Sequence, residues 1–165
     1  MRFRIILTSL IVFALAAAAS AQTKMSGTTQ CAKPDREYSI QVGDRPNHSF
    51  VISQFKCTWI KPWEIAGIQN REGVGTTFAE ISGNTSRILE YCVQTMANGD
   101  KAYWRDTGTI TLKDGVPQSA DVKGTLVGGT GKLKGVKAKA TCKLREAAAD
   151  GGMTADCEGE YELPK

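Results

Sequence analysis

The sequence has little of what most catalytic and metal-binding sites require. It contains one histidine, His48, and none of its five cysteines forms a Cys-x-x-Cys motif. Clustered ligands of these types are needed for a zinc site, so we expect no bound metal. Serine, histidine and aspartate are too scattered along the chain to suggest a nucleophilic triad. We therefore assign no catalytic residue and expect no cofactor.

Long apolar runs are also scarce. The single one, residues 5–19, follows Met-Arg-Phe-Arg and precedes Ala19-Ser20-Ala21, a small-x-small cleavage site. This pattern predicts a secretory signal peptide over residues 1–21. No later stretch is long enough to cross a bilayer, so we expect no membrane span. The sequence thus predicts a secreted protein, in the periplasm or outside the cell.

A strong charge of one sign is absent as well. The chain has 21 Lys and Arg against 17 Asp and Glu, a net charge of +4. Loss of Arg2 and Arg4 with the signal peptide would reduce it to +2. Because both signs are interleaved, no face suits a nucleic acid, and we expect no nucleic-acid partner.

No convincing helical pattern follows the signal peptide. About eight alternating segments, spaced by Gly, Asn and Asp turns, predict an all-β fold. Antiparallel strands of this length can close into a single barrel, with a two-sheet sandwich as the alternative. We expect a flexible N-terminal arm at residues 22–35, a barrel domain at residues 36–165 and a long loop at residues 61–74 within it.

The last two segments show the clearest register. Apolar residues alternate with lysines from Val136 to Leu144, and with acids from Met153 to Leu163. Antiparallel pairing with Cys142 opposite Cys157 predicts a disulfide and places lysines beside acids, as in Lys139 beside Glu160. Closing this loop of about fifteen residues would stabilise the fold by roughly 3 kcal/mol.

The other three cysteines are Cys31, Cys57 and Cys92. Five cysteines suit an oxidising compartment, and a second bridge would leave one thiol over. The sequence does not decide which two of the three pair.

A second hairpin is predicted around Asn98-Gly99 as a two-residue turn. This register places Tyr91 opposite Asp106, beside Trp104, on a mostly apolar face. Such a group could orient the polar atom of an apolar ligand, with the indole as a wall. Trp63, in the predicted loop, either covers the barrel mouth or caps the core. The opposite face would carry Glu90 and Arg105 as a surface ion pair.

The segment Gly128-Gly129-Thr130-Gly131-Lys132-Leu133-Lys134-Gly135 resembles the turn that precedes the last strands in allene oxide cyclase and dirigent-like barrels. The resemblance implies an eight-stranded antiparallel barrel with a central cavity, often in a homo-oligomer. Leu133 replaces the usual aromatic residue. The fold hosts enzymes and non-enzymes, so the motif does not imply cyclase chemistry.

Three functions remain compatible with these observations. The first is binding of a small, mainly apolar molecule inside the barrel, without catalysis; Tyr91, Trp104, Asp106 and Trp63 are the candidate contacts. The second is a cyclase- or isomerase-like enzyme acting on a lipid-like or phenolic substrate. The third is an envelope or adhesion component whose barrel interior is filled by side chains.

Overall fold

The computed structural model describes residues 22–148 and 150–165. The predicted signal peptide, residues 1–21, lies outside the described residues. The strands are β1 (Thr23–Cys31), β2 (Arg36–Gln41), β3 (His48–Lys61), β4 (Glu64–Ile65), β5 (Ile68–Ser82), β6 (Thr85–Met96), β7 (Lys101–Lys113), β8 (Val116–Gly129), β9 (Lys137–Ala147) and β10 (Met153–Glu162). The described part contains one 3₁₀ turn, η1 (Gly131–Leu133), and no helix long and apolar enough to span a membrane.

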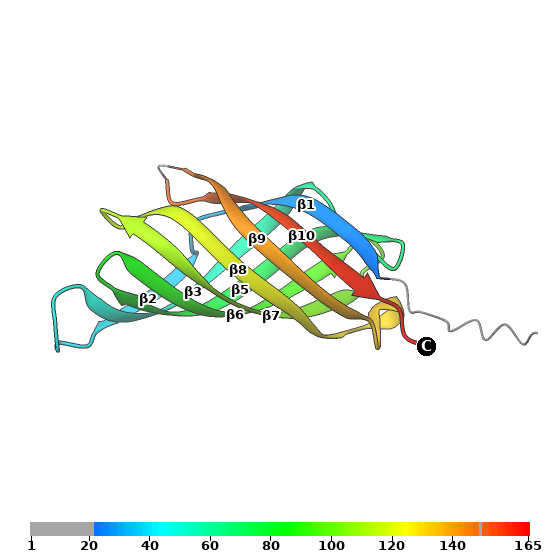
Figure 1. Ribbon diagram of the computed structural model, residues 1–165, viewed down its shortest axis with the longest axis horizontal. Coiled ribbons are helices and arrows are strands. Elements are labelled where there is room, and N and C mark those ends of the chain that lie inside the picture. Colours follow the sequence, from blue (N-terminus) through cyan, green and yellow to red (C-terminus); the bar gives the residue numbers. More distant parts are fainter. Residues whose placement is uncertain (1–21, 149) are drawn as a thin grey trace, which may run out of the picture.

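Eight of the strands form a closed antiparallel barrel, as predicted (Figure 1). They follow the order β3-β1-β10-β9-β8-β7-β6-β5, and β5 pairs with β3 to complete the ring. The short strands β2 and β4 are additions to this ring. β2 pairs with the first half of β3, and β1 pairs with the last residues of the same strand. Closure leaves the eight strands without a continuous exposed edge.

Strand β1 occupies part of the segment in which we predicted a flexible arm, so that prediction is wrong. β1 pairs with β10 along its whole length, from Thr23 opposite Tyr161 to Cys31 opposite Met153. Gly27 permits a close approach to β3, because a Cβ there would lie 2.6 Å from the carbonyl oxygen of Lys61. The polar composition concealed this strand, since its stability comes from pairing rather than from its own apolar residues.

The predicted loop at residues 61–74 is also wrong, because β4 and the start of β5 form a tight hairpin there. Ala66 and Gly67 provide the turn, with φ angles of 52° and 77°. The hairpin carries Trp63 and Ile65 into the core, where their exposures are 3% and 0%. The two side chains close one end of the barrel, which was the structural role considered for Trp63.

The last hairpin has the predicted register. Cys142 lies opposite Cys157 and is bonded to it, and Lys139 lies opposite Glu160. Although they are cross-strand neighbours, Lys139 and Glu160 do not form an ion pair. Glu160 instead accepts a bond from Lys24 Nζ of β1 at 2.8 Å, because the acid lies between two lysine-bearing strands.

The barrel interior is divided into two halves. One end holds η1 and the C-terminus (Figure 1). There, large buried side chains pack together in the interior, among them Trp63, Ile65, Met96, Trp104 and Leu133. Toward the other end, which holds the β5–β6 and β7–β8 turns, inward-facing residues such as Ile88 and Ile110 stay partly exposed. We call these the packed half and the open half.

Candidate functional site

The hairpin that joins β6 and β7 differs from its predicted register by one residue. Its loop has three residues rather than two, because Met96 pairs across to Asp100 and Gly99 takes a φ of 88°. Glu90 therefore lies opposite Asp106, and Tyr91 lies opposite Arg105. A slip of one residue moves each side chain of a strand to the other face.

This slip corrects two predictions. Tyr91 is on the outer surface, 53% exposed, so it does not face Asp106 as predicted. The surface ion pair between Glu90 and Arg105 is also wrong, because Glu90 points into the barrel. The sequence signal for Glu90 was its alternation with Ile88 and Cys92, which was assigned to the wrong face.

Trp104 and Trp63 lie together in the packed half. Their ring centroids are 5.5 Å apart, and the rings of Trp59 and Trp63 are tilted toward each other with centroids 4.5 Å apart. Neither Trp63 nor Trp104 lines the cavity of the open half, whereas Trp59 and Asp106 do. Ligand contact by Trp63 and Trp104 therefore stays a prediction, and Asp106 is the one proposed contact that reaches the cavity wall.

The cavity of the open half has a volume of about 280 Å³. Its wall is mostly apolar, and each barrel strand contributes to it, for example Val51 of β3, Ile88 of β6 and Val122 of β8. At the mouth, β9 pairs with β8 only at Asp121–Thr125, which leaves the start of β8 unpaired on that side. This size and this lining suit one small ligand.

Glu90 and Asp106 form a pair of carboxyl groups on the cavity wall. The Thr77 hydroxyl donates a hydrogen bond of 3.0 Å to Glu90 Oε2. Burial raises the pKa of Glu90. Burial, and then the neighbouring Glu90 carboxylate, raise the pKa of Asp106 to about 7. Two like charges in an apolar wall resist simultaneous ionisation, so the pair tends to share one proton near neutral pH.

Glycines on the adjacent strands make room for both acids. A Cβ on Gly75 of β5 would lie 2.7 Å from Glu90 Oε1 and 2.7 Å from the ring of Phe55. Gly124 of β8 lies opposite Asp106, and a Cβ there would collide with its carboxyl oxygen. The acids can therefore lie flat against the wall, with their oxygens accessible from the cavity.

Sulfur atoms line another part of the same wall. Cys31 and Cys57 form the second disulfide, and Cys92 is a buried free thiol. Burial, then Glu90 and Asp106, raise the pKa of the Cys92 thiol. A protonated, buried thiol is a weak nucleophile, so Cys92 is inert in this environment.

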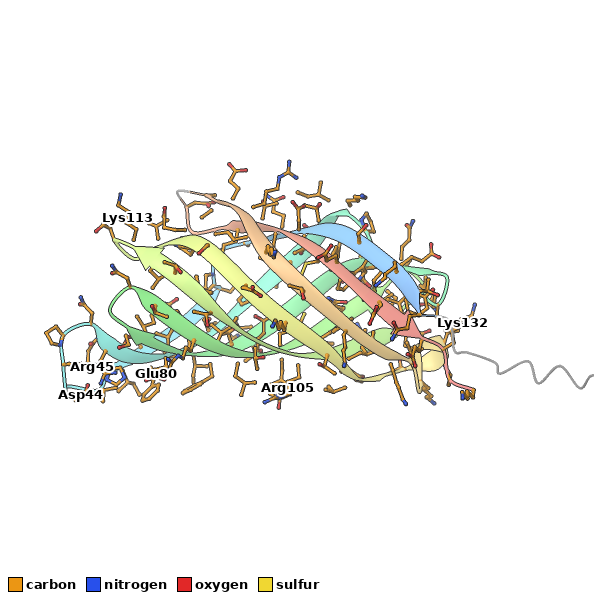
Figure 2. The ribbon with its side chains drawn as sticks, in the orientation of Figure 1. Asp44, Arg45, Glu80, Arg105, Lys113 and Lys132 are labelled. Atoms are coloured by element: carbon orange, nitrogen blue, oxygen red, sulfur yellow. A yellow bond between two sulfur atoms is a disulfide. The ribbon has the colours of Figure 1, made fainter. Side chains whose placement is uncertain are left out.

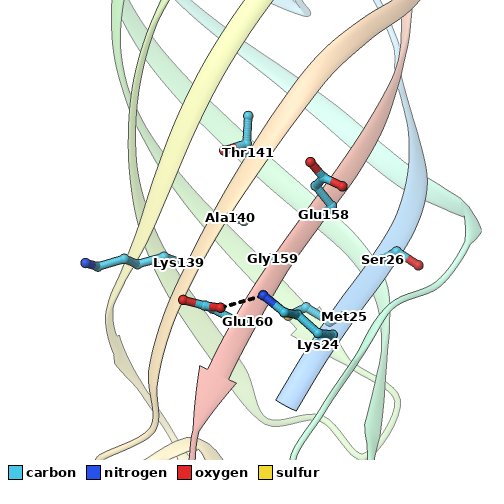
Figure 3. A pocket seen from close by; sticks show the side chains of 9 residues that line it. All are labelled: Lys24, Met25, Ser26, Lys139, Ala140, Thr141, Glu158, Gly159 and Glu160. Carbon is cyan, nitrogen blue, oxygen red and sulfur yellow. Dashed lines mark hydrogen bonds and ion pairs between the residues drawn. The ribbon is translucent and has the colours of Figure 1, made fainter. Parts of the chain in front are cut away.

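A larger hollow of about 590 Å³ lies on the outside of β1, β9 and β10 (Figure 3). It is a surface groove whose rim carries charges of both signs. In Figure 3, Glu160 bonds to Lys24 while Lys139 points away. Exposed, mutually compensated charges do not select a ligand, so the groove is a poorer site than the cavity inside the barrel.

His48 belongs to a charged cluster on the outer side of the turn before β3. Its ring nitrogens lie 2.5 Å from Asp44 Oδ1 and 3.2 Å from Glu80 Oε1. Arg45 adds bonds to the Ser82 hydroxyl, and Figure 2 shows Asp44, Arg45 and Glu80 grouped at this end. The cluster fastens the turn to β5. Among the described residues, no three His, Cys, Asp or Glu are placed to hold a metal ion.

Comparison with solved structures supports the fold. One pterocarpan synthase dirigent protein aligns over 88% of this chain and 97% of its own, with a TM-score of 0.51 and 13% identity. A second one aligns over 96% and 98%, again at a TM-score of 0.51 and 13% identity. No family model and no curated protein matches the sequence. The chain has the dirigent-like barrel fold, as the turn at Gly128–Gly135 suggested.

Proposed function

We propose that the protein is exported and binds a small, mainly apolar molecule in the open half of its barrel. The observation that carries this proposal is the cavity of about 280 Å³ inside the barrel. Its apolar wall favours an apolar ligand, and its carboxyl pair offers one polar contact. A barrel filled throughout, the basis of the envelope or adhesion hypothesis, does not match this interior.

Export is supported by the cysteine chemistry. The two disulfides, Cys31–Cys57 and Cys142–Cys157, join barrel strands and are typical of an oxidising compartment. We propose that the protein acts in the periplasm or outside the cell. Fractionation of the host, with immunodetection of a chain shortened by residues 1–21, tests this; recovery of the full-length chain in the cytoplasm contradicts it.

Two tryptophan variants on β8 test ligand binding. Val122 faces the cavity, and Val127 lies on the outer surface of the same strand. Val122→Trp should fill the cavity and abolish binding of the neutral dye N-phenyl-1-naphthylamine, measured by fluorescence. Val127→Trp should bind like the wild type. Equal binding by both variants, with circular dichroism showing both folded, would contradict binding inside the barrel.

A second candidate is an isomerase-like enzyme, favoured by the pKa of about 7 for Asp106 beside Glu90. A protonated and an ionised carboxyl group can deliver one proton to a substrate and remove another, which leaves its composition unchanged. Lipids and phenols extracted from the host and incubated in D₂O would then gain deuterium with the wild type but not with Asp106→Asn. Deuteration that survives this substitution contradicts the assignment.

We also propose that the chain forms a homo-oligomer through β2. Val42 N–H donates to the His48 carbonyl at 2.9 Å, so alternate residues of β2 bond to β3. The backbone groups of Glu37, Ser39 and Gln41 consequently point to a free edge. A second copy can pair there antiparallel about Ser39, which would set Tyr38 opposite Ile40 of that copy.

The outer surface beside this edge supports self-association. Tyr38 and Ile40 are each 71% exposed. Through the strand register they adjoin Ile52 and Phe50 of β3, and Phe78 of β5 follows Ile52. Exposed apolar clusters of this kind mark association surfaces.

Proline at position 39 tests the edge. Ser39→Pro removes an outward N–H that β3 does not use, so the variant should stay folded but become monomeric in light scattering. Ser39→Ala should keep the wild-type mass. A monomeric wild type, or an oligomeric proline variant, rules out this arrangement.

A further inference from the structure

We infer that Glu90 and Asp106 bind the protonated amino group of a small, otherwise apolar amine. The inference rests on the proposed function, because it names the chemical class of the molecule that the cavity would hold. It follows from the position of the two acids, from the charges on the cavity wall and from a serine hydroxyl group that borders the cavity closer to the mouth.

The two acids are placed to share one cation. They are direct cross-strand partners on β6 and β7, and both line the cavity. The Cβ atoms of such partners are about 4.5–5.5 Å apart. An ammonium group between them can donate a charge-assisted hydrogen bond of about 2.8 Å to each carboxylate.

The protein itself provides no cation for this pair. Glu37, Glu90 and Asp106 are the charged residues among the described lining residues, and no Lys, Arg or His is among them. Glu90 accepts a bond from the Thr77 hydroxyl, whereas Asp106 accepts no side-chain hydrogen bond from the described residues. Buried carboxylates without a counter-ion are costly, and a bound ammonium group would offset that cost.

Other ligand classes fit less well. A carboxylic acid would add a third negative charge beside two like charges. A metal ion would need more ligands than the pair supplies, and the described residues hold no group of three that could bind one. An alcohol offers one neutral donor, while an ammonium group offers three donors and a charge.

A separate observation indicates that the ligand extends from the acids toward the mouth. Ser86 lies on β6, four residues before Glu90 and on the same inner face. It is 5% exposed, and its hydroxyl has no hydrogen-bond partner among the described residues. This hydroxyl borders the cavity and is free to bond to a ligand there.

The wall between these polar points is apolar. Phe55 lies against Glu90 across Gly75, and Ile88 stands between Ser86 and Glu90 on the inner face of β6. Val122 of β8 also faces the interior. It is aligned with Ile88 of β6 through Gly108, which lies between them on β7. An alkyl or aryl body attached to the amino group would contact these side chains and lose little solvation.

Three probes of equal chain length separate the possibilities: n-hexylamine, n-hexanol and n-hexanoate, each measured by calorimetry on the full mature chain at about pH 8. We expect hexylamine to bind at least about tenfold more tightly than hexanol, since charge-assisted bonds are about twice as strong as neutral ones. Hexanoate should bind most weakly. Hexanol binding equal to or tighter than that of hexylamine overturns the inference.

Variants locate the effect. Asp106→Asn and Glu90→Gln should each weaken hexylamine binding by about tenfold or more. Each should leave the affinity for hexanol within about twofold of the wild-type value. Glu37→Gln, which removes the third acid of the wall, should change the affinity for hexylamine by less than about threefold. Retention of the full amine preference after both inner substitutions overturns the inference.

The pH dependence gives a second readout that does not need a variant. Hexylamine stays protonated below about pH 10, like a lysine side chain. The Asp106 carboxyl ionises as pH rises through about 7, so hexylamine affinity should rise from about pH 5.5 to about pH 8 while hexanol affinity stays flat. A flat hexylamine profile contradicts the inference.

These results also separate the inference from the proposed function. If the neutral dye and hexanol bind but hexylamine has no advantage, the amine inference fails and apolar binding stands. If neither the dye nor any of the three probes binds, the proposed function fails, and the amine inference fails with it.

Discussion

The two halves of the barrel share the same strands and the same alternation, yet one is filled and the other is hollow. In the packed half the inward positions carry indole, thioether and leucine side chains, such as Trp104, Met96 and Leu133. In the open half, large side chains such as Phe55 alternate with many smaller residues, such as Val51, Ala79 and Ala120. An eight-stranded barrel is just wide enough to be filled by large side chains. The volume of the inward residues therefore decides which half can hold a ligand.

A matched pair of leucines should show the largest difference. Leu133 is fully buried in the packed half, and Leu144 lines the cavity. Leu133→Ala should lower the free energy of unfolding by about 2–5 kcal/mol, because it leaves a void that the core cannot fill. Leu144→Ala should cost about 1 kcal/mol or less, since its side chain already borders open space. Urea denaturation measures both, and equal losses would mean that the halves are packed alike.

Removal of the disulfide between Cys31 and Cys57 should cause the second-largest loss in the free energy of unfolding. It spans 26 residues and holds β1 to β3 beside the cavity. Replacing both cysteines by serine should cost about 2–4 kcal/mol, because the unfolded chain regains the freedom of this loop.

The measurement is guanidinium denaturation, with Cys92→Ala as the control that removes the free thiol. A double variant as stable as the control would show that the open half does not depend on its covalent links.

The smallest effect should be the pH dependence of stability at Asp106. Its pKa is about 7 in the folded chain and about 3.9 in the unfolded chain. Between these values the folded state holds a proton that the unfolded state has lost, so stability falls as pH rises from about 4 to about 7. Asp106→Asn has no such proton. At about pH 8 the free energy of unfolding of Asp106→Asn should exceed that of the wild type by on the order of 1–2 kcal/mol. This value is reduced because Asp106 is partly exposed.

Thermal unfolding at several pH values tests this, with Asp121→Asn as the control on the exposed face of β8. Parallel pH profiles for wild type and Asp106→Asn would mean that Asp106 is well solvated. Its environment on the cavity wall would then not differ from that of an exposed carboxyl group such as Asp121.

Much of the barrel was predictable because it depends on local alternation. The segments from β5 to β10 alternate clearly, and charge and sulfur together specify the β9–β10 register. The Gly128–Gly135 turn was recognised for the same local reason. β1 escaped prediction, since its Ser, Thr and Gly residues carry no apolar signal and its partners β3 and β10 are distant in sequence.

The candidate site was predicted only in part. Asp106 was correctly assigned to an inward position, but Tyr91 was chosen as its partner in place of Glu90. The dipeptide Asn98-Gly99 is compatible with loops of two or three residues, and the sequence does not choose between them. One residue in that choice decides whether a phenol or a carboxyl group enters the cavity.

The sequence alone determined that this chain is all-β, that Cys142 faces Cys157 and that the last hairpin has one register, because each of these follows from periodicity over neighbouring residues. Only the tertiary structure decided that Cys31 bonds to Cys57, that Glu90 meets Asp106, and that half of the interior stays open. These features depend on how distant strands align and on how much volume their inward side chains fill together, and neither quantity is encoded in any single segment.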